Sequence, residues 1–180
     1  MSKKALSILM ATAGLLAAAS SAQAADGTIT ITGEITAQTC NISGDGGGKD
    51  FTVTLPNVST SALATPGSTA GRKPFRINLT NCSPNSGKAS VYFEPGTTVN
   101  AQTGQLFNAT GDAKNVEVGL LNKDGSKIEL GKAQAQQNSQ IVDITGAAAE
   151  LNYFAQYVAT GGASTAGTVN TSVMYSVSYQ

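Results

Sequence analysis

The stretch Gly167-Thr-Val-Asn-Thr-Ser-Val-Met-Tyr-Ser-Val-Ser-Tyr179, close to the carboxyl end of the chain, decides the fold class. Successive side chains of a β-strand point to opposite faces. One face would hold Gly167, Val169, Thr171, Val173, Tyr175, Val177 and Tyr179. The other face is polar except for Met174. This period of two predicts a strand with one buried face, either the last strand of an ordinary sandwich or a strand that also pairs with a second protein.

The stretch Ala25-Asp-Gly-Thr-Ile-Thr-Ile-Thr-Gly33 alternates in the same way, and we expect a strand over residues 28–35. Chain termini fray unless they are tied down. A threonine-rich strand so close to one end therefore needs a partner edge. That edge could belong to the protein's own sheet or to another subunit.

Alternation of apolar and polar residues recurs along the rest of the chain. It predicts strands at residues 51–55, 75–80, 115–121, 127–130, 140–145 and 151–159. The Asp124-Gly125 pair predicts a hairpin between the third and fourth of these. Stretches rich in Gly, Pro, Asn and Ser separate the others. Many short strands with such turns are typical of an all-β sandwich.

The composition argues against most enzyme and nucleic-acid-binding classes. The 180 residues include 11 Lys and Arg against 11 Asp and Glu, with no His and no Trp. No basic excess is available for phosphates, and a His-based triad or His-ligated metal site is excluded. A glycosidase needs only two carboxylates, for which Asp112, Glu117, Asp124 and Glu129 are candidates. We interpret them as solvated surface residues, and we expect no catalytic residue, cofactor or metal.

The first 24 residues have the layout of a secretory signal peptide. Lys3 and Lys4 precede an uncharged, largely apolar run over residues 5–19, and Ala22-Gln23-Ala24 ends the segment as an Ala-x-Ala cleavage pattern. A membrane anchor is the rival interpretation, but a span needs about 20 apolar residues. Export to an oxidising compartment favours a disulfide between the only two cysteines, Cys40 and Cys82.

Taken in order, these features resemble the major fimbrial subunits assembled by the chaperone–usher pathway, within the type 1 pilin group and most like the fimbrial subunits of Bordetella. The likeness covers essentially the whole chain. It rests on the start at residues 26–35, Cys40, the stretch 71–82 that leads to Cys82, the strand and turn at 91–96, the aromatic strand at 153–157, the penultimate Tyr179, and Gly167 at fourteenth from the end.

The resemblance implies an immunoglobulin-like sandwich that lacks its final strand and is completed by a donor strand from another subunit. It divides the chain into a signal peptide (1–24), a donor segment (25–35) and a pilin domain (36–180). The implied donor residues are Gly27, Ile29, Ile31, Gly33 and Ile35. The implied acceptor edge, which the chaperone also binds, consists of Gly167, Val169, Val173, Tyr175, Val177 and Tyr179. Gly27 would lie where the groove admits no side chain, and Gly167 would permit close approach at the start of the edge.

The implied function is that of a structural subunit of a surface fimbria that supports bacterial adhesion. Its partners would be copies of itself and related pilins in a head-to-tail filament, a periplasmic chaperone and an outer-membrane usher. It would pass through the periplasm to the cell surface. The alternative is a secreted carbohydrate-binding β-sandwich that acts alone, which the absence of Trp and the 156 residues after residue 24 make less favourable. No host receptor is indicated.

Overall fold

The computed structural model describes residues 27–33, 35 and 37–180 of a chain that divides into two units, residues 1–34 and 35–180. The predicted signal peptide lies outside the described residues. Residues 27–33 form no strand, and the side chains of Ile29 and Ile31 are 89% and 90% exposed. The strand predicted over residues 28–35 is therefore not formed by this chain alone, because a strand needs a hydrogen-bonding partner that alternation by itself does not supply.

The second unit contains nine strands and two short 3₁₀ helices in its described residues. The strands are β1 (Thr39–Gly44), β2 (Thr69–Ser83), β3 (Gly87–Phe93), β4 (Val99–Asn100), β5 (Gln105–Phe107), β6 (Val116–Asn122), β7 (Ile141–Ile144), β8 (Ala149–Ala159) and β9 (Tyr175–Tyr179). The helices are η1 (Thr60–Leu63) and η2 (Gln134–Gln136). The all-β prediction is confirmed.

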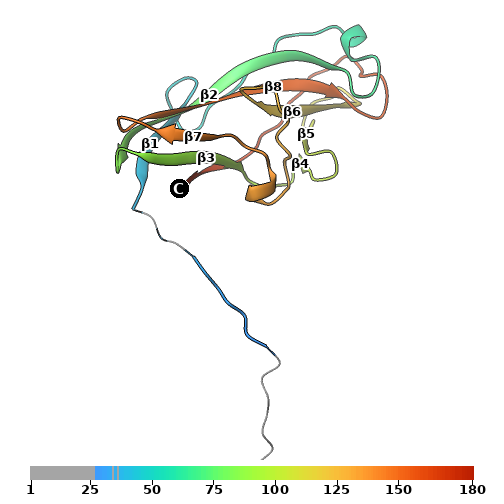
Figure 1. Ribbon diagram of the computed structural model, residues 1–180. Helices are drawn as coiled ribbons and strands as arrows, with labels where there is room; N and C mark the ends of the chain where they lie inside the picture. The colour runs from blue at the N-terminus through green and yellow to red at the C-terminus, as the bar shows by residue number, and fades with distance from the viewer. Residues whose placement is uncertain (1–26, 34, 36) are drawn as a thin grey trace, which may run out of the picture. The chain divides into compact units, whose positions relative to one another are not determined.

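The strands form two antiparallel sheets (Figure 1). The larger sheet has the order β1-β2-β8-β6-β5-β4, and the smaller has the order β7-β3-β9. The first is built around the long pairing of β2 with β8, which runs from Thr69 opposite Val158 to Leu79 opposite Ala149. In the second, β3 pairs with β7 on one side and with β9 on the other.

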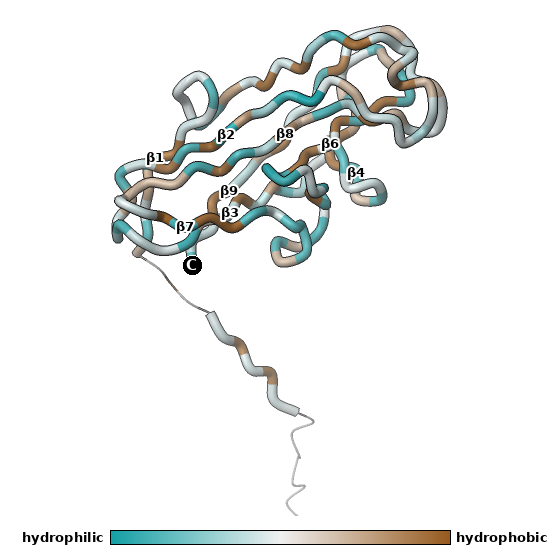
Figure 2. The backbone as a smooth tube through the Cα atoms, turned by 45° about the horizontal axis from the view of Figure 1, so that its top comes forward, coloured by the Kyte–Doolittle hydropathy of each residue, from teal (hydrophilic) through white to brown (hydrophobic). Residues whose placement is uncertain are grey.

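One hydrophobic core joins the two sheets. Alternate residues of β2 and β8 are buried, and their apolar and polar positions alternate along the tube in Figure 2. Tyr153 of β8 is at the centre, with its ring centroid 5.5 Å from that of Phe75 in β2 and 5.4 Å from that of Phe93 in β3. Leu151, Tyr153 and Ala155 all face this core from one side of β8, which accounts for the period-two pattern in this part of the chain.

The predicted disulfide is present between Cys40 and Cys82, with an S–S distance of 2.07 Å. It links β1 to the end of β2, next to the place where Thr39 lies opposite Ser83. The two cysteines are 42 positions apart. The bond therefore closes the whole segment that carries η1 and most of β2.

Besides the strand over residues 28–35, two further predicted strands are wrong, and the final strand is shorter than predicted because only Tyr175–Tyr179 forms β9. Residues 127–130 do not complete the hairpin at Asp124-Gly125: Lys127 forms an isolated bridge with Leu121, after which Leu130 donates to the carbonyl of Gly104. The Ile128 N–H still donates to the Leu120 carbonyl at 3.0 Å, and the segment then turns away from β6, with Ile128 and Leu130 fully buried in the core. Residues 51–55 keep the alternation of buried and exposed side chains but belong to neither sheet. No helix among the described residues is long and apolar enough to cross a membrane.

Candidate functional site: two unpaired edges and the cavity between them

The site lies between two extended segments from opposite ends of the second unit, residues 51–58 and residues 168–179. The rings of Phe51 and Tyr175 lie 6.2 Å apart, and the Tyr175 hydroxyl donates a 2.8 Å hydrogen bond to the Lys49 carbonyl. Farther along the two segments, Val58 and Val169 both line the same cavity. We call residues 51–58 the first edge and residues 168–179 the final-strand edge.

The final-strand edge is open on one side. Its strand β9 pairs only with β3 within the described chain. Gln180 and Lys88 exchange both backbone hydrogen bonds, at 2.7 and 2.9 Å, so even-numbered residues bond toward β3. Neighbouring residues of a strand direct their backbone groups to opposite sides. The N–H and C=O groups of Tyr175, Val177 and Tyr179 therefore point away from β3, where no strand pairs with them.

The first edge carries no hydrogen bond within the described chain: neither the backbone nor the side chains of residues 51–58 take part in one. Its side chains still alternate, with Phe51, Val53 and Leu55 half-buried against the core and Thr52 and Thr54 exposed. The segment therefore has the form of a strand but lacks a partner. Unpaired edges of this kind are templates for another strand.

Apolar side chains of the final-strand edge complete the site. Val169, Val173, Tyr175, Val177 and Tyr179 are only partly buried and pack on the core. The structure thus places the predicted acceptor residues in one row that faces the core. Burial raises the pKa of both Tyr175 and Tyr179. Neither edge contains an Asp, Glu, Lys or Arg, so the site suits an uncharged, apolar strand.

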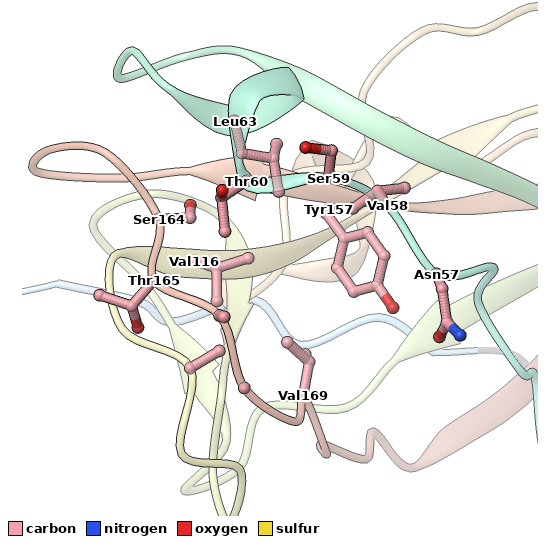
Figure 3. Close-up of a pocket in the computed structure, with 13 residues that line it drawn as sticks. Asn57, Val58, Ser59, Thr60, Leu63, Val116, Tyr157, Ser164, Thr165 and Val169 are labelled. Carbon is pink, nitrogen blue, oxygen red and sulfur yellow. The ribbon is translucent and has the colours of Figure 1, made fainter.

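At one end the two edges border a cavity of about 230 Å³ (Figure 3). Asn57 and Val58 come from the first edge, and Thr165 and Val169 come from the segment that leads into β9; Tyr157 and Val116 also line it. The buried cluster of Leu63, Ala113, Val116 and Ala159, against which Tyr157 and Val169 pack, lies beside it. The floor of this end is therefore apolar.

Gly167 lies where the chain enters the final-strand edge. Its φ of +152° favours glycine, and a Cβ there would lie 2.5 Å from the Ala113 nitrogen and 2.7 Å from an Asp112 oxygen. The close approach that Gly167 permits in this structure is thus to its own chain. A role for Gly167 toward another strand remains a prediction.

Each of the four candidate carboxylates is engaged by its own neighbouring polar groups. Asp112 accepts from Thr168, Asp124 accepts from Ser126, and Glu129 lies 3.1 Å from the Lys127 ammonium. The expectation of a solvated surface residue is wrong for Glu117, which is buried and accepts hydrogen bonds from Asn100 at 2.8 Å and from Thr103 at 2.7 Å. Among the described residues, no group of three or more His, Cys, Asp or Glu could hold a metal ion.

Sequence reasoning missed the first edge as part of the site. The alternation of Phe51, Val53 and Leu55 was visible, but alternation reports which face is buried and not which backbone groups are paired. The contacts of Asn108 and Asp112 with the start of the final-strand edge were also missed, because they join residues about 60 positions apart in the chain.

Comparison with known proteins agrees with this geometry. Residues 55–180 match the family model of the type-1 fimbrial protein, A. The major fimbrial subunit SMF-1 of Stenotrophomonas maltophilia is 48% identical over 92% of this chain and 99% of its own length. The serotype 2 fimbrial subunit of Bordetella pertussis is 38% identical over 93% of each. The crystal structure of the P pilus rod subunit PapA aligns with a TM-score of 0.58 at 18% identity, over 78% of this chain and 99% of that one. The chain therefore belongs to the type-1 fimbrial protein family.

Proposed function

We propose that this chain is a structural subunit of a surface fimbria, and that copies of it join head to tail by donor-strand exchange. The observation that carries the proposal is the pair of edges. Residues 51–58 and 168–179 present unpaired backbone groups and half-buried apolar side chains across the same opening. A strand inserted between them would pair with both edges and complete the core. This role needs no catalytic residue and no cofactor.

The inserted strand would be residues 27–35 of another subunit. Ile29 and Ile31 are almost fully exposed in the single chain, and the segment has no charge before Glu34. Each Ile would contribute about 1.5–3 kcal/mol on burial. At about 3.4 Å per residue, residues 27–35 span roughly 27 Å, and residues 169–179 span roughly 34 Å. The donor is thus long enough to cover most of the final-strand edge. A head-to-tail insertion leaves an unused donor at one end and an unused opening at the other, so the assembly can continue as an open filament.

A soluble copy of the donor should stabilise the second unit. We expect a peptide of residues 27–35, added to a chain that begins at residue 36, to raise its unfolding temperature in a concentration-dependent manner, because a ligand that binds only the folded state stabilises it by mass action. The measurement is thermal unfolding followed by circular dichroism. A peptide with Ile29→Asp and Ile31→Asp is the matched control. Equal shifts with both peptides would contradict the donor assignment.

We further propose that a periplasmic chaperone occupies the same opening before assembly, and that an outer-membrane usher hosts the exchange. Open edges of this kind aggregate unless they are covered. The chaperone would supply a strand that pairs with residues 175, 177 and 179, whose backbone groups point away from β3.

The chaperone proposal can be tested by introducing a lysine at Val177, with the same substitution at Met174 as the control. Val177 packs on the core, whereas Met174 is 70% exposed on the opposite face. We expect Val177→Lys to reduce co-purification of the subunit with its chaperone about tenfold or more, because a buried ammonium without a partner is strongly unfavourable. Met174→Lys should leave the yield unchanged. The proposal fails if the two variants co-purify equally.

A further inference from the structure

We propose that residues 108–113 act as a clasp that fixes the position of the first part of the final-strand edge, with Asp112 and Asn108 as its positioning residues. The inference rests on the proposed function of that edge. Residues 168–174 precede β9 and belong to neither sheet. An acceptor edge that starts at residue 168 must therefore be held there by something other than a neighbouring strand.

Asp112 holds Thr168. Its Oδ1 accepts hydrogen bonds from the Thr168 N–H and from the Thr168 hydroxyl, the latter at 2.7 Å. The Ala113 N–H donates to the Thr168 carbonyl at 3.1 Å. The bond from the Thr168 N–H, followed by that from its hydroxyl, lowers the pKa of Asp112. The carboxylate is thus the form that the contact favours.

Asn108 forms hydrogen bonds with the backbone of Asn170 and of Thr168. Its Oδ1 accepts from the Asn170 N–H at 2.9 Å, and its Nδ2 donates to the Thr168 carbonyl at 3.0 Å. The Ala109 N–H donates to the Asn170 carbonyl at 2.9 Å. The backbone groups of residues 168 and 170 are therefore all bound on the side of the clasp. Because neighbouring residues of an extended chain direct their backbone groups to opposite sides, the backbone groups of Val169 and Thr171 point toward the open side.

Two glycines show how closely the clasp and the edge approach each other. A Cβ at Gly111 would lie 2.1 Å from the Thr168 carbonyl oxygen and 2.3 Å from Asn108 Oδ1. A Cβ at Gly167 would collide with Ala113 and Asp112. Both segments thus lack a side chain where they meet, which allows the loop to take the place of a strand along residues 168–170. The clasp keeps Val169 at the cavity, in register with the side chains of β9.

Asp112→Ala in the full-length protein tests the inference. Hydrogen exchange would be measured by mass spectrometry on assembled fibres. We expect exchange at residues 169–173 to become about tenfold faster, because the variant loses hydrogen bonds to a charged acceptor. Exchange in β2 and β8 should not change. Asp112→Asn, which keeps an acceptor oxygen, should restore most of the protection.

Asp124→Ala is the matched control. Asp124 Oδ1 accepts from the Ser126 N–H at 2.8 Å and from the Ser126 hydroxyl at 2.6 Å, which is the same chemistry in a turn that contacts neither edge. This variant should leave exchange at residues 169–173 at the wild-type rate. If Asp112→Ala yields no fibres, the same comparison is made on the monomer at Thr168 and Asn170.

Unchanged protection at residues 168–173 in Asp112→Ala would overturn the clasp. So would an equal loss of protection in β2 and β8, since that result would mean a general loss of stability and not a local positioning role. Failure of the proposed function would look different. Residues 169–173 of the wild-type protein would then exchange as fast in fibres as in the monomer, whatever residue occupies position 112.

Discussion

Ile31→Asp is expected to abolish fibre formation while leaving a folded, disulfide-bonded monomer. In the single chain Ile31 is 90% exposed, so the substitution costs the isolated subunit almost nothing. In the assembled fibre it would place a carboxylate among Val173, Tyr175 and the other uncharged side chains of the opening. The variant would lose about 1.5–3 kcal/mol of apolar burial, and it would also bury a charge without a partner. Electron microscopy of cells and gel filtration of the purified subunit would measure the two expectations.

Thr30→Asp provides the control for this variant. Thr30 lies in the same segment but on the opposite face of the predicted strand. An aspartate there would face solvent in the fibre, and fibres should form at close to the wild-type level. Normal fibres from Ile31→Asp, or loss of fibres from both variants alike, would contradict the assignment of Ile29 and Ile31 as the inward-facing donor residues.

Removing the disulfide should have the second large effect. We expect Cys40→Ala combined with Cys82→Ala to destabilise the subunit by about 4 kcal/mol, since the bond restricts a loop of 42 positions in the unfolded chain. Stabilities of small domains are of the order of 5–15 kcal/mol. A sandwich with two unpaired edges would retain little stability without the bond. The double variant should therefore be present in the periplasm at a much lower level than the wild type. Urea unfolding of the purified subunit and immunoblots of periplasmic extracts would measure this.

Reduction of the wild-type protein is a control that leaves every side chain in place. Dithiothreitol should lower the urea midpoint of the wild type to that of the double variant and should not change the midpoint of the variant itself. A double variant that unfolds within about 1 kcal/mol of the wild type would show that the loop constraint contributes little. The hydrophobic contacts of β1 with β2 would then carry the stability of this region.

Much of the fold could be predicted because an alternation of apolar and polar residues indicates a strand with one buried face. Residues 75–80, 115–121, 140–145 and 151–159 alternate, and β2, β6, β7 and β8 lie over them. Alternation does not report hydrogen-bond partners. It therefore predicted strands at residues 28–35 and 51–55, which have the right side chains but no neighbouring strand in their own chain. We assign a role in assembly to both of these segments. The further error, at residues 127–130, falls on a segment whose Ile128 and Leu130 belong to the core.

The site was predictable in part for a similar physical reason. The row from Val169 to Tyr179 follows from period two and from the likeness to fimbrial subunits. The clasp could not be predicted, because Asn108 and Asp112 act through hydrogen bonds to Thr168 and Asn170, which are distant in the chain. Short polar side chains in a loop have no periodicity, and only the folded chain shows which backbone groups they reach.

The position of the disulfide has a mechanical consequence for a fibre joined by donor strands. Tension on such a fibre enters each subunit through residues 27–35, and Cys40 follows only five positions after Ile35. From Cys40 the load passes through a covalent bond to Cys82 and into β2, which pairs with β8 over most of its length. Pulling therefore cannot peel β1 away from its sheet one hydrogen bond at a time.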